Sequence, residues 1–201
     1  MNEPRIRLAQ APYSEATLAA FARIMPEGVP PLALFRALAT NERVFLRMMA
    51  GGLLDRGSLT LREREIVIDR TCFRCGSEYE WGVHIAFFGS RVGFTPEEIA
   101  GLCADDPAST SFSERERLLL RLCDELHATS TLGDALWAEL ARVWSHEQLV
   151  ELVVLAGYYH AIAFATNALR VPLEAFGARF PRASEDGGGS GNGNANGRGS
   201  V

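Results

Sequence analysis

Apolar residues recur with helical spacing along most of the chain, and polar residues with capping side chains separate one run from the next. In the first run, Leu18, Phe21 and Met25 follow Ser14 and stop before Pro26. Spacings of three and four residues are typical of amphipathic helices. No segment alternates between apolar and polar residues for long enough to predict a convincing strand. The pattern therefore predicts an all-α fold.

Capping sequences mark where the later helices begin. Thr60–Glu63, Ser77–Glu80 and Ser145–Gln148 have the pattern of a capping box, in which a Ser or Thr and an acid or amide three residues later cap each other's backbone. Thr95 and Pro96 supply a cap and a first-turn proline. Helices are predicted to begin near residues 14, 32, 41, 60, 77, 95, 113, 134 and 145.

The predicted helices form one domain with a tail. Residues 1–182 are long enough for a single core, whereas residues 183–201 are rich in Gly, Asn and Ser and are expected to be disordered. A weak internal similarity relates Glu65–Ile68, which precedes Glu80 and His84, to Glu151–Val154, which precedes Tyr158. This similarity is consistent with a duplicated helical hairpin.

Charge and composition limit the partners. The net charge is −5, with acidic and basic residues interleaved, so no basic stripe indicates nucleic-acid binding. The polar N-terminus and the absence of a long apolar run predict no membrane partner, a cytoplasmic location and reduced cysteines. Apolar residues on several helix faces, among them Phe87, Phe164 and Leu169, predict a homo-oligomer.

Glu65, Glu80 and His84 form the candidate catalytic group. Glu80 and His84 are four residues apart and share one helix face, while Glu65 belongs to the preceding helix, which a turn at Gly76 would fold back alongside. Carboxylates beside an imidazole orient it and raise its pKa, which suits proton transfer. Simpler interpretations stay open, because Glu80 could only cap its helix, Glu65 could be solvated and His84 could be a hydrogen-bonded core residue.

Aromatic residues near this group could wall a substrate pocket. The candidates for substrate binding are Tyr79, Trp81 and Phe88, with His160 as a weaker one. We expect a small-molecule substrate bound between helices, with no cofactor and no metal ion.

The motif around these residues resembles the carboxymuconolactone decarboxylase / alkylhydroperoxidase D family. The resemblance rests on Arg64–Ile66, on Glu78–His84 and on Phe87–Ile99, and weaker similarity continues through the last predicted helix. It implies an all-helical bundle, an acid at Glu65 on the helix before the motif, the motif histidine at His84, and assembly as trimers or hexamers.

The chain departs from the peroxidase branch of that family at the motif itself. The branch has a Cys-x-x-Cys where this sequence has Ser77 and Glu80, so its dithiol chemistry cannot run at these positions. The decarboxylase branch instead has an acid four residues before the histidine, as Glu80 stands here. The resemblance thus favours acid–base chemistry on a small organic acid, a lactone or an enolisable carbonyl compound.

The main alternative to acid–base chemistry is a thiol peroxidase with peroxiredoxin activity that uses Cys72 and Cys75. They form a Cys-x-x-Cys, but five residues before the family's position and near the end of a helix, where the helix dipole disfavours a thiolate. Two cysteines without further ligand spacing do not predict a zinc site. A third possibility is a non-catalytic oligomeric protein that binds a small ligand.

Overall fold

A computed structural model describes residues 3–53 and 56–181, and the predicted tail at 183–201 lies outside them. The described residues are helical and contain no strand, which confirms the all-α prediction. The elements are α1 (Glu15–Ile24), α2 (Ala33–Leu38), α3 (Glu42–Gly51), α4 (Leu61–Arg74), α5 (Glu78–His84), the π-helix Ile85–Gly89, α6 (Pro96–Leu102), the 3₁₀-helix Pro107–Ser109, α7 (Glu114–Thr129), α8 (Asp134–Ala141) and α9 (His146–Leu169).

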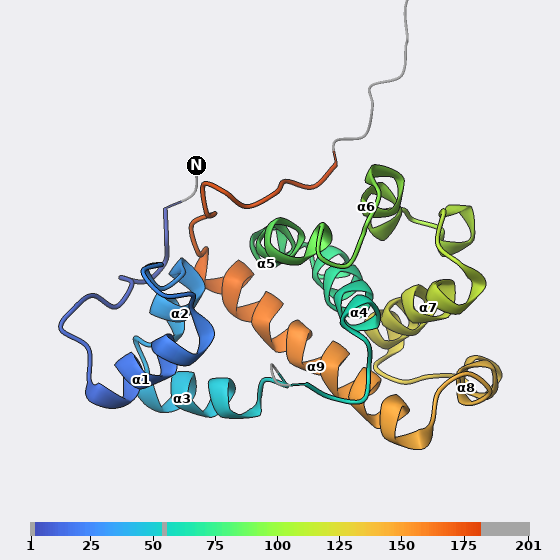
Figure 1. The fold of residues 1–201 in the computed structure, drawn as a ribbon, viewed down its shortest axis with the longest axis horizontal. Helices are drawn as coiled ribbons and strands as arrows, with labels where there is room; N and C mark the ends of the chain where they lie inside the picture. Colours follow the sequence, from blue (N-terminus) through green and yellow to red (C-terminus); the bar gives the residue numbers. More distant parts are fainter. Residues whose placement is uncertain (1–2, 54–55, 182–201) are drawn as a thin grey trace, which may run out of the picture.

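Helix α4 lies at the centre of the bundle. It contacts α5, α6, α7 and α9, while α1–α3 pack at one end of the molecule and α6–α8 at the other (Figure 1). Every residue from Glu63 to Cys72 is buried, so α4 is enclosed on all sides although it carries five charged residues in that stretch. Charged residues on a helix in this position need partners from the neighbouring helices.

Four of the helix starts have complete capping boxes. They are at Thr60, Thr95, Ser113 and Ser145, and in each the residue three positions later bonds back to the cap. The capping box predicted at Ser77 is wrong, because the Ser77 hydroxyl lies 2.8 Å from the Thr166 hydroxyl of α9 and does not cap α5. Glu80 is therefore not held by a cap and can face the interior.

The connection between α4 and α5 is the tight turn that the sequence predicted. Gly76 has a φ of +64°, a conformation that glycine adopts without the strain of a side chain. The amide of Ser77 donates to the Cys72 carbonyl at 2.8 Å and closes the turn. This turn folds α5 back onto α4 and brings the motif helix beside Glu65.

The predicted hairpin duplication does not form as such. Glu151–Val154 and Tyr158 lie on one continuous helix, α9, whereas Glu65 and His84 lie on the two arms of a hairpin. Helix α9 is also long and apolar enough to cross a membrane by length and composition, which the sequence analysis did not anticipate. Its inner residues, Leu152 and Leu155 among them, are fully buried in the core, as in the core helix of a globular domain.

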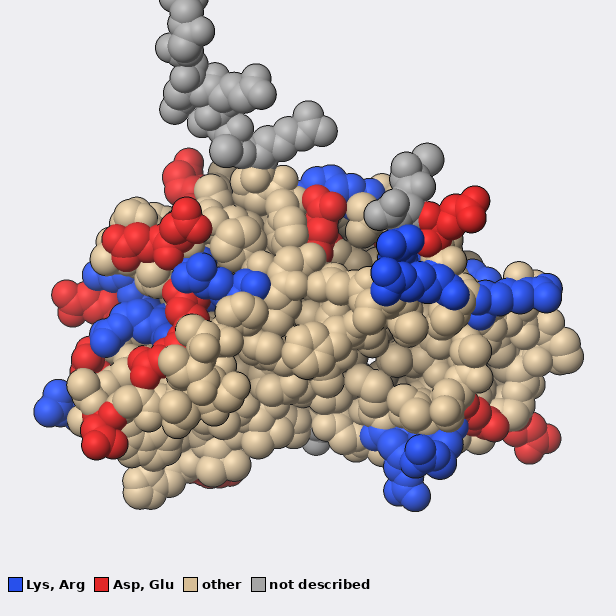
Figure 2. Space-filling view, turned by 180° about the vertical axis from the view of Figure 1, so that it is seen from behind, with Lys and Arg blue, Asp and Glu red and all other residues tan. Residues whose placement is uncertain are grey.

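The surface outside the core mixes charges. On the face seen in Figure 2, acidic and basic side chains are interspersed toward the end formed by α6–α8, and uncharged residues occupy the middle. Helix α9 leaves Val150, Val154 and Phe164 more than half exposed, at 65%, 51% and 66%. These positions share one side of the helix, since they are separated by 4 and 10 residues.

Arg70 is the most deeply buried charge of α4, with a fully buried side chain. Its guanidinium binds both carboxylate oxygens of Asp124 on α7 at 2.7 Å and donates to the carbonyls of Leu102 and Ala104. Arg74 binds the same carboxylate at 2.6 and 2.8 Å. The two arginines hold the pKa of Asp124 below its ordinary value although burial opposes them.

We expect Asp124→Asn to lower the free energy of unfolding by about 3–5 kcal/mol, because it leaves Arg70 buried without a counter-charge. The matched control is Glu139→Gln, which breaks the exposed Arg121–Glu139 pair and should cost less than about 1 kcal/mol. Urea denaturation of the two variants measures both values. Equal losses would contradict the assignment of Asp124 as the main counter-charge.

Candidate functional site

His84 is held between residues of three helices. Its Nδ1 lies 2.8 Å from Oε2 of Glu65 on α4, and its Nε2 lies 3.4 Å from Oε1 of Glu80, one turn earlier on α5. The same Nε2 is 3.2 Å from the hydroxyl of Tyr159 on α9. The structure thus brings together the three residues that the sequence singled out, and it adds a tyrosine.

The surroundings favour a charged imidazole. His84, Glu65 and Glu80 are 8%, 2% and 7% exposed, so little water screens their interaction. Burial by itself lowers the pKa of His84, but the charges and hydrogen bonds of Glu65 and Glu80 outweigh it and raise that pKa well above 6.5. As an imidazolium, His84 donates from Nδ1 to Glu65 and from Nε2 toward Tyr159 and Glu80.

Asp69 adds a third acid next to this group. It lies one turn after Glu65 on α4, it is 1% exposed, and neither of its carboxylate oxygens has a hydrogen-bond partner among the described residues. Burial and the nearby charge of Glu65 raise the pKa of Asp69 well above its ordinary value. The surroundings of Asp69 therefore favour its neutral form.

A cavity of about 940 Å³ opens onto this group. Glu65, Glu80, His84 and Tyr159 contribute to its wall, and apolar side chains from α1, α2, α5 and α9 form most of the rest. Phe88 lies against the imidazole, with ring centroids 5.4 Å apart. The volume fits a small organic molecule, and mostly apolar walls with a few convergent polar groups are typical of ligand sites.

Four arginines also line the cavity. Arg23, Arg56 and Arg91 are exposed and stand on its solvent side, while Arg64 is 8% exposed and lies deeper, with its Nη1 3.8 Å from Glu151. The guanidinium of Arg91 lies over the ring of Phe88, 5.3 Å from its centroid. With four cations and the two carboxylates Glu65 and Glu80 in its lining, the cavity favours an anionic ligand.

Two of the predicted aromatic residues do not line this cavity. Tyr79 is buried, and its hydroxyl donates to Glu174 at 2.8 Å and accepts from the amide of Leu34 at 3.0 Å, so it ties three segments together. Trp81 is 1% exposed and packs against Phe180. Both predictions as substrate-binding residues are therefore corrected, whereas Phe88 is in the lining as expected.

His160 is also corrected. It projects from α9 away from the cavity, and its Nε2 lies 3.2 Å from Nδ1 of His127. Its neighbour Tyr159 takes the place near His84 that the sequence analysis considered for His160. On a helix, consecutive residues point about 100° apart, so only one of the two could face the site.

Cys72 and Cys75 are free thiols, the first buried and the second partly exposed. Cys72 is fully buried, and burial together with the charges of Glu80 and Asp69 raises the pKa of its thiol well above the ordinary value. Cys75, at the C-terminal cap of α4, is half-buried, and burial raises its pKa to about 11. Neither environment favours the thiolate that a reactive cysteine needs.

The sequence analysis missed Asp69, Tyr159 and the arginines as residues of this site. Asp69 had a usable signal, because it follows Glu65 by four residues on the same helix face. The arginines come from α1, from the segment before α4, from α4 itself and from the residues after the π-helix, so only the folded chain gathers them.

Comparisons with known proteins agree with this geometry. Residues 36–125 match the model of the carboxymuconolactone decarboxylase family. No curated protein matches the sequence. Among solved structures, a peroxidase-related protein from Silicibacter sp. TM1040 has a TM-score of 0.74 at 16% identity, over 90% of this chain and 100% of that one.

A second structure is described as an alkylhydroperoxidase AhpD core, a peroxidase-related protein from Ralstonia eutropha JMP134. It has a TM-score of 0.71 at 15% identity, over 86% of this chain and 93% of that one. Identities this low show the fold alone, and the fold is the one that the resemblance implied. Residues 36–125 are thus similar to the carboxymuconolactone decarboxylase family, and the chain has the alkylhydroperoxidase AhpD-core fold.

Proposed function

We propose that this chain is a cofactor-independent acid–base enzyme that acts on a small organic acid, lactone or enolisable carbonyl compound, with decarboxylation as the reaction. The observation that carries the proposal is the 2.8 Å contact between His84 and Glu65 at the wall of an arginine-lined cavity. Two carboxylates keep the imidazole protonated and oriented, which is what a general acid requires.

His84 would supply the proton. When the bond between the substrate and its carboxyl group breaks, carbon dioxide leaves and the electron pair stays on the substrate as an enolate. The imidazolium of His84 donates its Nε2 proton to that carbon and becomes neutral, and water returns a proton to it afterwards. Glu65 holds Nδ1 throughout, while Glu80 and Tyr159 position the donating nitrogen.

The arginines would select the substrate. Arg91 and Arg64 can bind a carboxylate that is not lost in the reaction, and the apolar walls exclude water from the carbon that is protonated. A substrate with one carboxylate near the arginines and a second near His84 fits the distribution of charge in the cavity.

A thiol peroxidase that uses Cys72 and Cys75 is the second candidate. The comparisons support this candidate better than the first, since both solved structures are described as peroxidase-related. The described thiols oppose it, because Cys72 has no solvent exposure and burial holds both thiol pKa values above the ordinary range. A protein that binds an anionic ligand without turnover is the third candidate.

The assembly belongs to the same proposal. We expect a homo-oligomer, a trimer or hexamer as in the family that the sequence resembles. Val150, Val154 and Phe164 on α9 support it, because exposed apolar side chains along one helix face often meet a partner.

Variants of His84 test the acid–base proposal in a screen of β-keto acids and muconolactone-like acids. We expect His84→Gln to lower kcat by about 10²–10⁴-fold, because it removes the proton donor and leaves the cavity walls. The product formed in D₂O should carry deuterium at the carbon that lost carbon dioxide. The matched control is His146→Gln, at the exposed start of α9, which should keep wild-type kcat.

Three other results would decide against this role. If His84→Gln is unfolded at the assay temperature, the residue serves the fold. If kcat is unchanged, another group donates the proton. If the wild type binds these acids in a calorimeter but turns none of them over, the protein is a ligand-binding one.

Hydroperoxide reduction tests the second candidate. We expect the wild type to show no cysteine-dependent consumption of organic hydroperoxide, because neither thiol is poised to ionise. Cys75→Ser and Cys72→Ser should then match the wild type in a peroxide assay with an added dithiol reductant. Peroxide consumption that is lost in Cys75→Ser and kept in Cys103→Ser would establish the peroxidase instead.

A further inference from the structure

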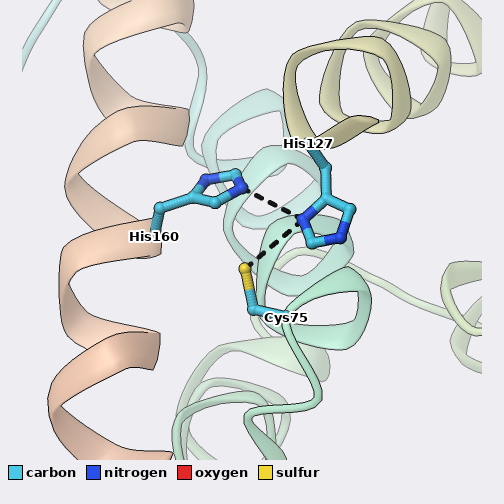
Figure 3. A group of neighbouring side chains, drawn as sticks. All are labelled: Cys75, His127 and His160. Carbon is cyan, nitrogen blue, oxygen red and sulfur yellow. Dashed lines mark hydrogen bonds between the residues drawn. The ribbon is translucent and has the colours of Figure 1, made fainter. Parts of the chain in front are cut away.

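Cys75, His127 and His160 form a cluster outside the candidate active site (Figure 3). Cys75 caps the end of α4, His127 lies in the last turn of α7 and His160 lies in the middle of α9. Their side chains point toward one another, and one nitrogen or sulfur atom of each lies within 4.8 Å of the others. None of the three belongs to the described lining of the large cavity, so the cluster is not needed for the proposed proton transfer.

Two of the three distances between these atoms match the edges of a tetrahedral metal site. Nδ1 of His127 is 3.7 Å from Sγ of Cys75 and 3.2 Å from Nε2 of His160. Zinc–nitrogen bonds of about 2.0–2.1 Å and zinc–sulfur bonds of about 2.3 Å place a tetrahedral N–S edge at about 3.6 Å and an N–N edge at about 3.3 Å. Both observed distances lie within about 0.1 Å of these edges, and the third pair of atoms, Sγ of Cys75 and Nε2 of His160, lies within 4.8 Å.

A hydrogen bond fixes the protonation that zinc requires at His160. Its Nδ1 lies 2.8 Å from the carbonyl of Ala156, one turn earlier on α9, so Nδ1 carries the proton and donates it. The lone pair is then on Nε2, which faces His127. Such an outer hydrogen bond to a backbone carbonyl is common among metal-binding histidines, where it fixes the tautomer and the ring orientation.

The environment of His127 favours a neutral imidazole, and the cluster is accessible to an ion. Partial burial, the other imidazole and the charge of Arg74 lower the pKa of His127, although Asp124 opposes this effect and binds Arg74. His127 is exposed and His160 is partly buried, so an ion can enter from solvent. The thiol of Cys75, with a pKa of about 11, would lose its proton on binding, because a bound cation stabilises the thiolate.

We propose that Cys75, His127 and His160 bind a zinc ion, with a fourth position open to water or another small ligand. One sulfur and two imidazole nitrogens suit zinc better than magnesium or calcium, which prefer oxygen ligands. The ion would join the ends of α4 and α7 to α9, the helix that also carries Tyr159. Zinc at this site would therefore hold α4, α7 and α9 together at their contact.

Metal titration of the tag-free, reduced and chelator-treated full chain tests the site. We expect one Zn²⁺ per chain by calorimetry, a higher Tm with Zn²⁺, and for Co²⁺ the visible bands of a tetrahedral ion with a thiolate charge-transfer band. Cys75→Ser and His127→Ala should each weaken Zn²⁺ binding by more than the roughly 10–100-fold that loss of an outer partner costs, and should remove the Tm increase. Cys103→Ser and His146→Ala, which change the same residue types elsewhere, should bind as the wild type does.

Two outcomes would overturn the proposal. One is the absence of saturable binding of Zn²⁺ and Co²⁺ to the wild type. The other is binding that survives in both Cys75→Ser and His127→Ala, which would place the ion elsewhere. Circular dichroism of the metal-free variants separates loss of a ligand from loss of the fold, and because His127 is exposed, its variant is expected to fold even if the Cys75 variant does not.

Discussion

The burial of charge on α4 is the constraint on which the rest of this structure depends. A helix enclosed on all sides carries Glu63, Glu65 and Arg70 into the interior, and unpaired charges there would cost several kcal/mol each. Neighbouring helices supply a partner for each of the three. Glu63 accepts from Arg115 of α7 and from Trp144, and these bonds and those to Thr60 lower its pKa to about 2 despite burial. Asp124 of α7 binds Arg70, and His84 of α5 binds Glu65. These ion pairs determine the positions of the neighbouring helices around α4.

The same constraint produces the candidate chemistry. Glu65 is neutralised by a histidine rather than by an arginine, so the pair includes a group that can release a proton to a ligand. Glu80 reinforces the charge on that histidine from the far side, while burial raises the pKa of Asp69 and favours its neutral form. The cavity then presents an imidazolium at one part of its wall and arginines at others, an arrangement that suits anionic substrates. Stability and proposed function thus rest on one set of buried ionisable groups.

The sequence predicted what depends on neighbours in the chain and failed where a contact comes from far away. Helix starts at Thr60, Thr95 and Ser145 were predictable because a capping box is complete within four residues. The same pattern at Ser77 misled, because its hydroxyl is engaged by Thr166, 89 residues later. Glu65, Glu80 and His84 could be grouped from their spacing and from the family resemblance. Nothing local could show that Tyr159 rather than His160 faces them.

The proposed metal site could not be predicted from the sequence for the same reason. Its ligands are separated by 52 and 33 residues, so no short ligand motif exists in the sequence. The sequence analysis therefore expected no metal ion, and it treated Cys75 only as half of a Cys-x-x-Cys. In the folded chain the Cys75 sulfur lies 3.7 Å from Nδ1 of His127, and the two thiols are free.

The most direct test of the central claim is an NMR titration of the His84 imidazole in the intact protein, with His84→Gln to assign its signal. The account predicts a pKa well above 6.5, so His84 stays protonated as the pH rises through neutrality. Glu65→Gln should lower that pKa, because it removes the charge at 2.8 Å and leaves the burial that opposes protonation. A His84 that titrates at or below 6.5 in the wild type, or that is unaffected by Glu65→Gln, would contradict the account.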